Sequence, residues 1–242
     1  MMTDKQPRYS RIMLKLSGEV LAGPHGCGID PAQAAVIAAK IKVIYDLGVE
    51  VGLVIGAGNL WRGSIGVQHG MAQPTADHMG MLATVMNGLA LQDALERIDV
   101  PTRVQTAVTM NQVAEPYIRL RAMRHMQKGR VVIIAGGTGN PYFTTDTAAA
   151  LRAMEVGAEV LIKGTQVDGI YTEDPKKNPN ARKFDAISYS QAIEYRVRVM
   201  DLTALTLCMD HKLPVIVLNI WDNHSLLDAV LGKAVGTLVD GE

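Results

Sequence analysis

Cysteines are scarce in this sequence of 242 residues, and long apolar runs are absent. Cys27 and Cys208 stand alone, which excludes a zinc knot or a redox CxxC motif and predicts ordinary thiols in a reducing compartment. The longest apolar runs, such as 131–135, have the length of a strand, and the first eleven residues are polar. We therefore expect neither a membrane span nor a signal peptide, and predict a cytoplasmic protein.

An excess of charge of either sign is also lacking. Lys plus Arg number 24 and Asp plus Glu number 24, so the formal net charge is zero. Without a global field, neither nucleic acid nor an anionic membrane is an expected partner, and any anion site must be built locally. Apolar residues make up 48% of the chain, which at this length predicts one large domain over residues 1–242.

Strand-like and helix-like segments alternate along the chain. Asp30 and Pro31 are favoured as the N-cap and first residue of a helix, which Gly48 ends. Such alternation predicts an α/β fold, a three-layer α-β-α sandwich with a largely parallel central sheet and ligands at the carboxyl ends of its strands. Strands are predicted at 11–16, 49–55, 102–106, 130–135, 159–163 and 214–219, and further helices at 76–96, 117–127, 147–156 and 202–211.

Two further predictions concern the long helix at 76–96 and the loop at 168–185. The loop is rich in Pro, Asn and charge, and is predicted to be a mobile flap. The helix is expected to bury one apolar side, consisting of Met79, Leu82, Ala83, Met86, Leu89 and Ala90.

Glycine clusters follow three of the predicted strands, at 17–18, 56–59 and 136–140. Glycine there lets backbone N–H groups approach a phosphate, and a following helix N-terminus adds a favourable dipole. A single cluster is more simply explained as a tight turn, but three at matching strand ends favour phosphate binding.

The familiar nucleotide-binding signatures are missing. Trp61 stands where a dinucleotide fingerprint needs its third glycine, and Gly232-Lys233 is followed by Ala234 instead of the Ser or Thr of a P-loop. The His-Arg-Asp catalytic loop of protein kinases is absent as well. Phosphate must be bound by another scheme.

Basic residues lie near the glycine clusters. Lys15 and Lys163 end predicted strands, and Arg62 follows the second cluster. A strand-end lysine among apolar neighbours is costly unless an anion compensates its charge, although each of these residues could also be a solvated rim residue. Asp146 precedes an alanine-rich helix, where it could cap the helix or hold two lysines in place.

Five separated segments together resemble bacterial uridylate (UMP) kinases of the amino-acid-kinase fold. They are Lys-Leu-Ser-Gly-Glu at 15–19, Gly-Ala-Gly-Asn at 56–59, the segments 77–88 and 167–171, and Gly-Asn-Pro-Tyr-Phe-Thr-Thr-Asp at 139–146. The resemblance covers essentially the whole chain, in order and spacing.

The resemblance implies phosphoryl transfer from MgATP to UMP, with Lys15, Arg62, Asp146 and Lys163 as catalytic residues. Mg²⁺ would be held by the nucleotide phosphates and water, without a protein metal site. The implied ATP site consists of Lys15, Leu16, Ser17, Gly18, Gly58, Arg62, Thr165, Tyr171 and Asp174. The implied UMP site consists of Ala57, Asp77, Thr138, Gly139, Asn140, Pro141, Tyr142, Phe143, Thr144 and Thr145.

Many relatives are hexamers activated by GTP and inhibited by UTP, so a homo-oligomer, GTP and UTP are candidate partners. Gln92 and Glu96 stand where some relatives carry basic side chains, which leaves Arg103 and Arg130 as candidate GTP contacts. Ala57 replaces a usual glycine and would be strained if its φ were positive.

Two alternatives remain open from the sequence. Another enzyme of the same fold could phosphorylate an acyl or carbamoyl acceptor, for which an Arg would suit the substrate better than Asp77. A non-catalytic nucleotide binder, like the molybdenum storage proteins of similar fold, would not need to retain Lys15, Asp77 and Asp146 together.

Overall fold

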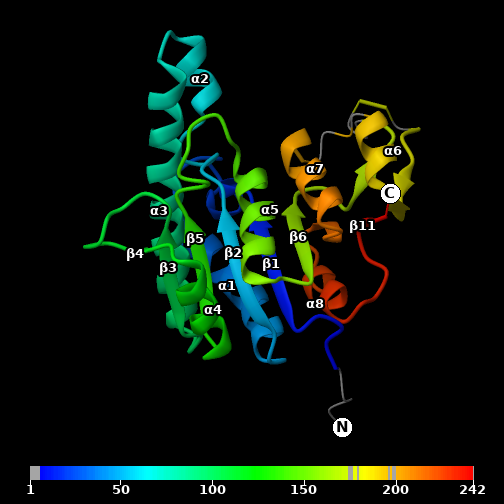
Figure 1. Cartoon of the computed structure of the whole chain (residues 1–242), viewed down its shortest axis with the longest axis horizontal. Helices are drawn as coiled ribbons and strands as arrows, with labels where there is room; N and C mark the ends of the chain where they lie inside the picture. Colours follow the sequence, from blue (N-terminus) through cyan, green and yellow to red (C-terminus); the bar gives the residue numbers. More distant parts are fainter. Residues whose placement is uncertain (1–5, 174–176, 179, 196, 198–199, 242) are drawn as a thin grey trace.

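A computed structural model describes residues 6–173, 177–178, 180–195, 197 and 200–241. In these residues one sheet has the strand order β4-β3-β5-β2-β1-β6-β10-β11-β9, and β7 and β8 form a separate hairpin (Figure 1). The strands are β1 (Arg11–Leu16), β2 (Glu50–Ile55), β3 (Thr102–Thr106), β4 (Glu115–Pro116), β5 (Val131–Ala135), β6 (Val160–Thr165), β7 (Ile170–Tyr171), β8 (Lys183–Phe184), β9 (Ala186–Ile187), β10 (Val215–Asn219) and β11 (Thr237–Val239).

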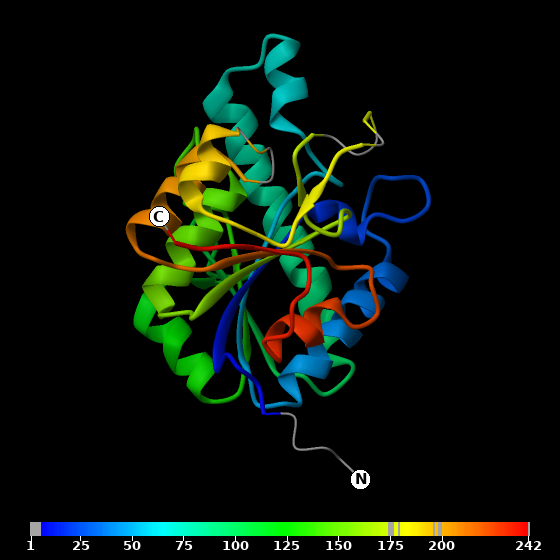
Figure 2. The same cartoon turned by 90° about the vertical axis from the view of Figure 1, so that its right-hand side faces the viewer.

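Helices cover both faces of the sheet, which confirms the predicted α/β sandwich (Figure 2). The core packs α1, α3 and α8 on one face and α4, α5 and α7 on the other. The helices are α1 (Pro31–Tyr45), α2 (Gly63–Gln68), α3 (Gln73–Glu96), α4 (Arg119–Gln127), α5 (Thr145–Val156), α6 (Tyr189–Glu194), α7 (Leu202–Asp210) and α8 (Ser225–Val230), with a 3-10 turn η1 (Gly18–Leu21).

The six predicted strands and five predicted helices are all present, with ends within a few residues of those expected. Asp30 caps α1 as predicted, because its side chain accepts a hydrogen bond from the Ala32 N–H at 2.8 Å. At α5 the cap is Thr144, and Asp146 lies inside the first turn. This position leaves the Asp146 carboxylate available for other partners.

The predicted buried side of α3 is wrong for three of its six residues. Met79, Leu82 and Met86 are 37%, 47% and 54% exposed, whereas Ala83 is buried and Leu89 packs against the core as expected. The helix is apolar around most of its circumference, so the pattern could not identify which stripe faces the sheet. Its buried face also includes two polar residues that bond to loops at the sheet edge: the Thr84 hydroxyl accepts from the Gly136 N–H, and the Asn87 amide donates to the Gly56 carbonyl.

The C-terminal third contains elements that the sequence did not predict, including the antiparallel strand β11 beside β10. The expected flap at 168–185 includes the β7–β8 hairpin, in which Ile170 pairs with Phe184. Both strands have only two residues, too short for a periodic pattern. No helix in the described part of the chain is long and apolar enough to cross a membrane.

Candidate active site

Two lysines lie side by side at the carboxyl ends of neighbouring parallel strands. Lys15 on β1 and Lys163 on β6 are register partners. Side chains alternate along a strand, so each lysine faces the same way as the residue two positions before it, Met13 or Leu161. Both of those residues pack in the core beneath α5. The two lysine side chains therefore point toward the N-terminus of α5.

Asp146, in the first turn of α5, bridges the two lysines. Its Oδ1 lies 2.7 Å from Nζ of Lys15 and its Oδ2 lies 2.6 Å from Nζ of Lys163. Burial would raise the pKa of Asp146, but the two ammonium groups outweigh burial and lower it. Burial and then the charge of Lys15 lower the pKa of Lys163 to about 8. We call these three residues the Lys-Asp-Lys cluster.

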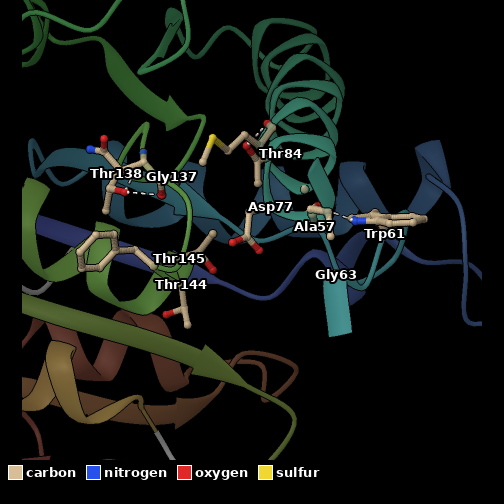
Figure 3. Close-up of a pocket in the computed structure, with 14 residues that line it drawn as sticks. Ala57, Trp61, Gly63, Asp77, Thr84, Gly137, Thr138, Thr144 and Thr145 are labelled. Carbon is tan, nitrogen blue, oxygen red and sulfur yellow. Dashed lines mark hydrogen bonds between the residues drawn. The ribbon is translucent and has the colours of Figure 1, made fainter. Parts of the chain in front are cut away.

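A pocket opens between α3 and the loop that leads into α5 (Figure 3). Ala57 and Gly63 line one wall, and Thr138, Thr144 and Thr145 line the opposite wall. Asp77 projects from α3 into the space between these walls (Figure 3). The pocket thus combines polar hydroxyl groups with one carboxylate, a lining suited to a polyhydroxylated ligand such as a nucleoside.

Asp77 also holds the opposite loop in place. Its Oδ2 accepts a hydrogen bond from the Tyr142 N–H at 2.8 Å, and its Oδ1 accepts one from Nε2 of Gln73 at 2.7 Å. Tyr142 has a φ of +72°, a left-handed conformation that is costly for a side chain other than glycine. The Asp77 carboxylate therefore stabilises a strained backbone at the edge of the pocket, and each oxygen keeps a further lone pair for a ligand.

The chain matches the amino acid kinase family over residues 10–219. It belongs to that family.

Solved structures of UMP kinases are similar to this amino acid kinase over nearly its whole length. The UMP kinase of Bacillus anthracis has a TM-score of 0.93 and 39% identity, with 96% of each chain covered. The UMP kinase of Ureaplasma parvum has a TM-score of 0.90 and 37% identity, covering 97% of this chain and 100% of that one. The uridylate kinase of Archaeoglobus fulgidus has a TM-score of 0.74 and 29% identity, covering 94% and 99%.

The predicted ATP-site residues of this amino acid kinase come from several loops. Leu16 ends β1, Ser17 caps η1, and Gly58 lies beside Glu19. Arg62 pairs with Glu19, and its described contacts do not include the Lys-Asp-Lys cluster. Its place among the catalytic residues therefore stays a prediction.

The other predicted ATP-site residues lie at the end of β6 and beyond it. The Thr165 hydroxyl caps the turn after that strand, accepting from the Val167 N–H at 3.0 Å. Tyr171 is not a core anchor, because its side chain reaches the surface and its hydroxyl donates to Asp168 at 2.7 Å. Its flat ring is thus available to a ligand, while Asp174 lies outside the described residues.

The predicted UMP site consists of Ala57, Asp77 and the loop at 138–145. Gly139 has a φ of +84° and lies against Ala107, so only glycine fits there. Ala57 is not among the described residues with positive φ, and the strain considered for it does not arise. The lining residues are Ala57, Trp61, Gly63, Ala76, Asp77, Gly80, Met81, Thr84, Gly137, Thr138, Asn140, Phe143, Thr144 and Thr145. Of the predicted loop residues, Gly139, Pro141 and Tyr142 are not among them.

Sequence reasoning missed Asp201, the N-cap of α7. Its carboxylate accepts hydrogen bonds from the hydroxyls of Thr144 and Thr147, the latter at 2.9 Å, and from the Ala204 N–H. It thereby joins the N-termini of α5 and α7 beside the Lys-Asp-Lys cluster. An Asp before a helical stretch is an N-cap signal, but its second role depends on contacts across 54 residues of chain.

Proposed function

We propose that this amino acid kinase transfers the γ-phosphoryl group of MgATP to UMP, giving ADP and UDP, in the cytoplasm as a step of pyrimidine nucleotide synthesis. The observation that carries the proposal is the buried Lys-Asp-Lys cluster at the sheet edge, together with the pocket that presents Asp77. Two cations held by one carboxylate suit the charge of a migrating phosphoryl group. The similarity to UMP kinases supports uridylate as the acceptor.

The acceptor phosphate can attack without a general base. A phosphate monoester has a second pKa of about 6, so at neutral pH it is largely a dianion with a nucleophilic oxygen. The obstacle is repulsion between two anionic phosphates, which Lys15 and Lys163 reduce. Asp146 positions both ammonium groups before the substrates bind, so little reorganisation is needed during transfer.

Magnesium would bind with the nucleotide. Both oxygens of Asp146 contact lysines, so this carboxylate is engaged elsewhere. In the described part of the chain no group of three His, Cys, Asp or Glu side chains could hold a metal ion. Mg²⁺ usually keeps several waters, so we propose that the ATP phosphates and water supply its ligands, and the ion would neutralise phosphate charge there.

The outer face of α3 supports assembly into a homo-oligomer, which we propose to be a hexamer. Met79, Leu82 and Met86 lie exposed along this face, where a second copy could cover them. UTP is the proposed inhibitor and GTP the proposed activator. Of the candidate GTP contacts, Arg103 pairs with Glu96 at 3.3 Å and Arg130 bonds to His125, so GTP would have to compete with these bonds.

A coupled assay of ADP release tests the reaction, with UMP, CMP, AMP or no acceptor added. The proposal expects release with UMP that clearly exceeds the other three. Equal release without acceptor would indicate simple ATP hydrolysis, and no release with retained ATP binding would indicate a non-catalytic binder. A kinase for acyl or carbamoyl acceptors is disfavoured because the pocket presents Asp77 where a substrate carboxylate would need a cation.

A further inference from the structure

Two buried asparagines lie behind the glycine loops of the site. Asn59 follows β2 and Asn87 is on α3, and their exposed fractions are 3% and 0%. Nδ2 of Asn59 donates to Oδ1 of Asn87 at 3.0 Å, and Nδ2 of Asn87 donates to Oδ1 of Asn59 at 2.7 Å. This reciprocal bonding fixes the orientation of both amides, and each amide keeps one N–H for another partner.

The remaining N–H groups of this asparagine pair hold the backbone of two loops. Asn87 donates to the carbonyl oxygen of Gly56 at 2.8 Å. Asn59 donates to the carbonyl oxygen of Gly28 at 2.7 Å, and the Gly28 N–H donates back to the Asn59 carbonyl at 2.9 Å. Every side-chain N–H of the pair is therefore bonded, as a buried polar pair requires.

The loop after β1 rests directly on the same pair. A Cβ added to Gly18 would lie 2.4 Å from Oδ1 of Asn59, 2.6 Å from the carbonyl oxygen of Gly56 and 2.9 Å from Nδ2 of Asn87. Such distances exclude any side chain at Gly18 unless the backbone moves. The asparagine pair thus sets the spacing between the loop after β1 and the loop after β2.

We propose that Asn59 and Asn87 are positioning residues for phosphoryl transfer, because they fix the loop at Gly18 relative to the loop at 56–58. This inference rests on the proposed function, in which the first loop holds ATP and the second contributes Ala57 to the UMP site and Gly58 to the ATP site. In-line transfer needs the donor and acceptor phosphates aligned, and a displacement of about 1 Å can cost about 100-fold in rate. Neither asparagine needs to touch a nucleotide to act in this way.

The test compares Asn59→Ala, Asn87→Ala and the double variant. We expect kcat to fall by about 30-fold or more in each single variant, while both KM values stay within about threefold. The double variant should lose little more than the worse single one, because the two residues share their bonds. Hydrogen exchange at peptides covering 16–19 and 54–60 should become faster in all three.

A matched control is Thr102→Val, which removes another buried hydrogen-bonding group far from these loops. Thr102 is the first residue of β3, and its hydroxyl donates to the Val100 carbonyl at 2.9 Å. This variant should lower Tm yet keep kcat. If Asn87→Ala does not fold, Asn59→Ser carries the test, since it leaves the bond from Asn87 to Gly56 in place.

Two outcomes would overturn the inference: folded variants with unchanged kcat, or losses confined to KM. Failure of the proposed function is separable from both. In that case the unsubstituted protein would not phosphorylate UMP, whereas the change in hydrogen exchange would still report the link between the loops.

Discussion

Asp77 combines a predicted ligand contact with an observed structural one, because it faces the pocket and also accepts the Tyr142 N–H. Replacing Asp77 by Asn turns one acceptor oxygen into a donor. Losing a charged hydrogen bond to the ribose would cost about 1.5 to 3 kcal/mol. We expect KM for UMP to rise selectively in steady-state assays, with KM for ATP nearly unchanged.

Asp93→Asn is the matched control for this change. It makes the same substitution on the same helix, at an exposed residue that pairs with Arg97 away from the pocket. Both KM values should stay as in the unsubstituted enzyme. An equal rise of both KM values in Asp77→Asn would place this residue outside the UMP site.

The geometry of the Lys-Asp-Lys cluster predicts that the chemical step needs Lys15 and Asp146. Lys15→Ala and Asp146→Asn should each lower kcat by about 100-fold or more while nucleotide binding stays measurable, because a preorganised charge contributes about 3 to 4 kcal/mol. Asp146→Asn should also lower Tm, since it leaves two neighbouring ammonium groups uncompensated.

His78→Gln serves as the comparison for both variants. His78 is exposed, with Nδ1 2.7 Å from the Pro74 carbonyl oxygen, and no proton acceptor is required in the mechanism. Its kcat should stay within a few-fold of the unsubstituted enzyme, with circular dichroism checking the fold. Loss of turnover in His78→Gln with activity retained in Lys15→Ala would refute the mechanism.

The lowered pKa of Lys163 predicts that activity declines at alkaline pH. Its pKa is lowered to about 8 by burial and by Lys15, so its charge is lost as pH rises through that value. Because kcat/KM reports the free enzyme, it should fall about tenfold per pH unit above the pKa. A profile from pH 6 to 10 measures this, and Lys163→Arg, which stays charged, should shift the decline to higher pH. A flat profile to pH 9.5 would count against a role for this charge.

At the scale of elements, local signals placed the helices and strands well. Apolar runs ended by Lys15 and Lys163 predicted β1 and β6. The sequence could not predict the buried stripe of α3, because packing chooses among several apolar faces. It also missed β7, β8 and β9, which have two residues each and no periodicity of their own.

The cap of α1 provides a test of one such local signal. Asp30→Ala should destabilise the protein by about 1 kcal/mol in urea unfolding, because the Ala32 N–H loses its acceptor. Asp30→Asn should cost less, since Asn is also a good N-cap. Equal losses for Ala and Asn would mean that the carboxylate acts through another contact.

For the whole molecule, the exposed face of α3 predicts self-association. A double variant, Leu82→Glu with Met86→Lys, places charges on side chains that are 47% and 54% exposed. In light scattering we expect a closed oligomer for the unsubstituted protein and smaller species for this variant, because buried charges oppose association.

The matched control is Val43→Lys on α1, where Val36 and Val43 are 43% and 46% exposed. Scattered exposed apolar residues are ordinary on a protein surface, so this change should leave the assembly intact. A monomer of the unsubstituted protein at micromolar concentration would contradict the prediction.

The sequence alone determined the fold class, the order of the main elements and the residues at the strand ends. These follow from local properties, namely apolar periodicity, helix caps and glycine turns. It also indicated that Asp146 could hold two lysines, which the ion pairs confirm. The proposed chemistry rests largely on these residues.

Only the tertiary structure decided how distant segments meet. Asp201 reaches Thr147, Asp77 holds Tyr142, and Asn59 pairs with Asn87 across intervals of 54, 65 and 28 residues. Each contact depends on the sheet register and on the face that a helix turns inward. Those features are settled by the joint packing of the whole core, because no local pattern distinguishes one apolar face of α3 from another.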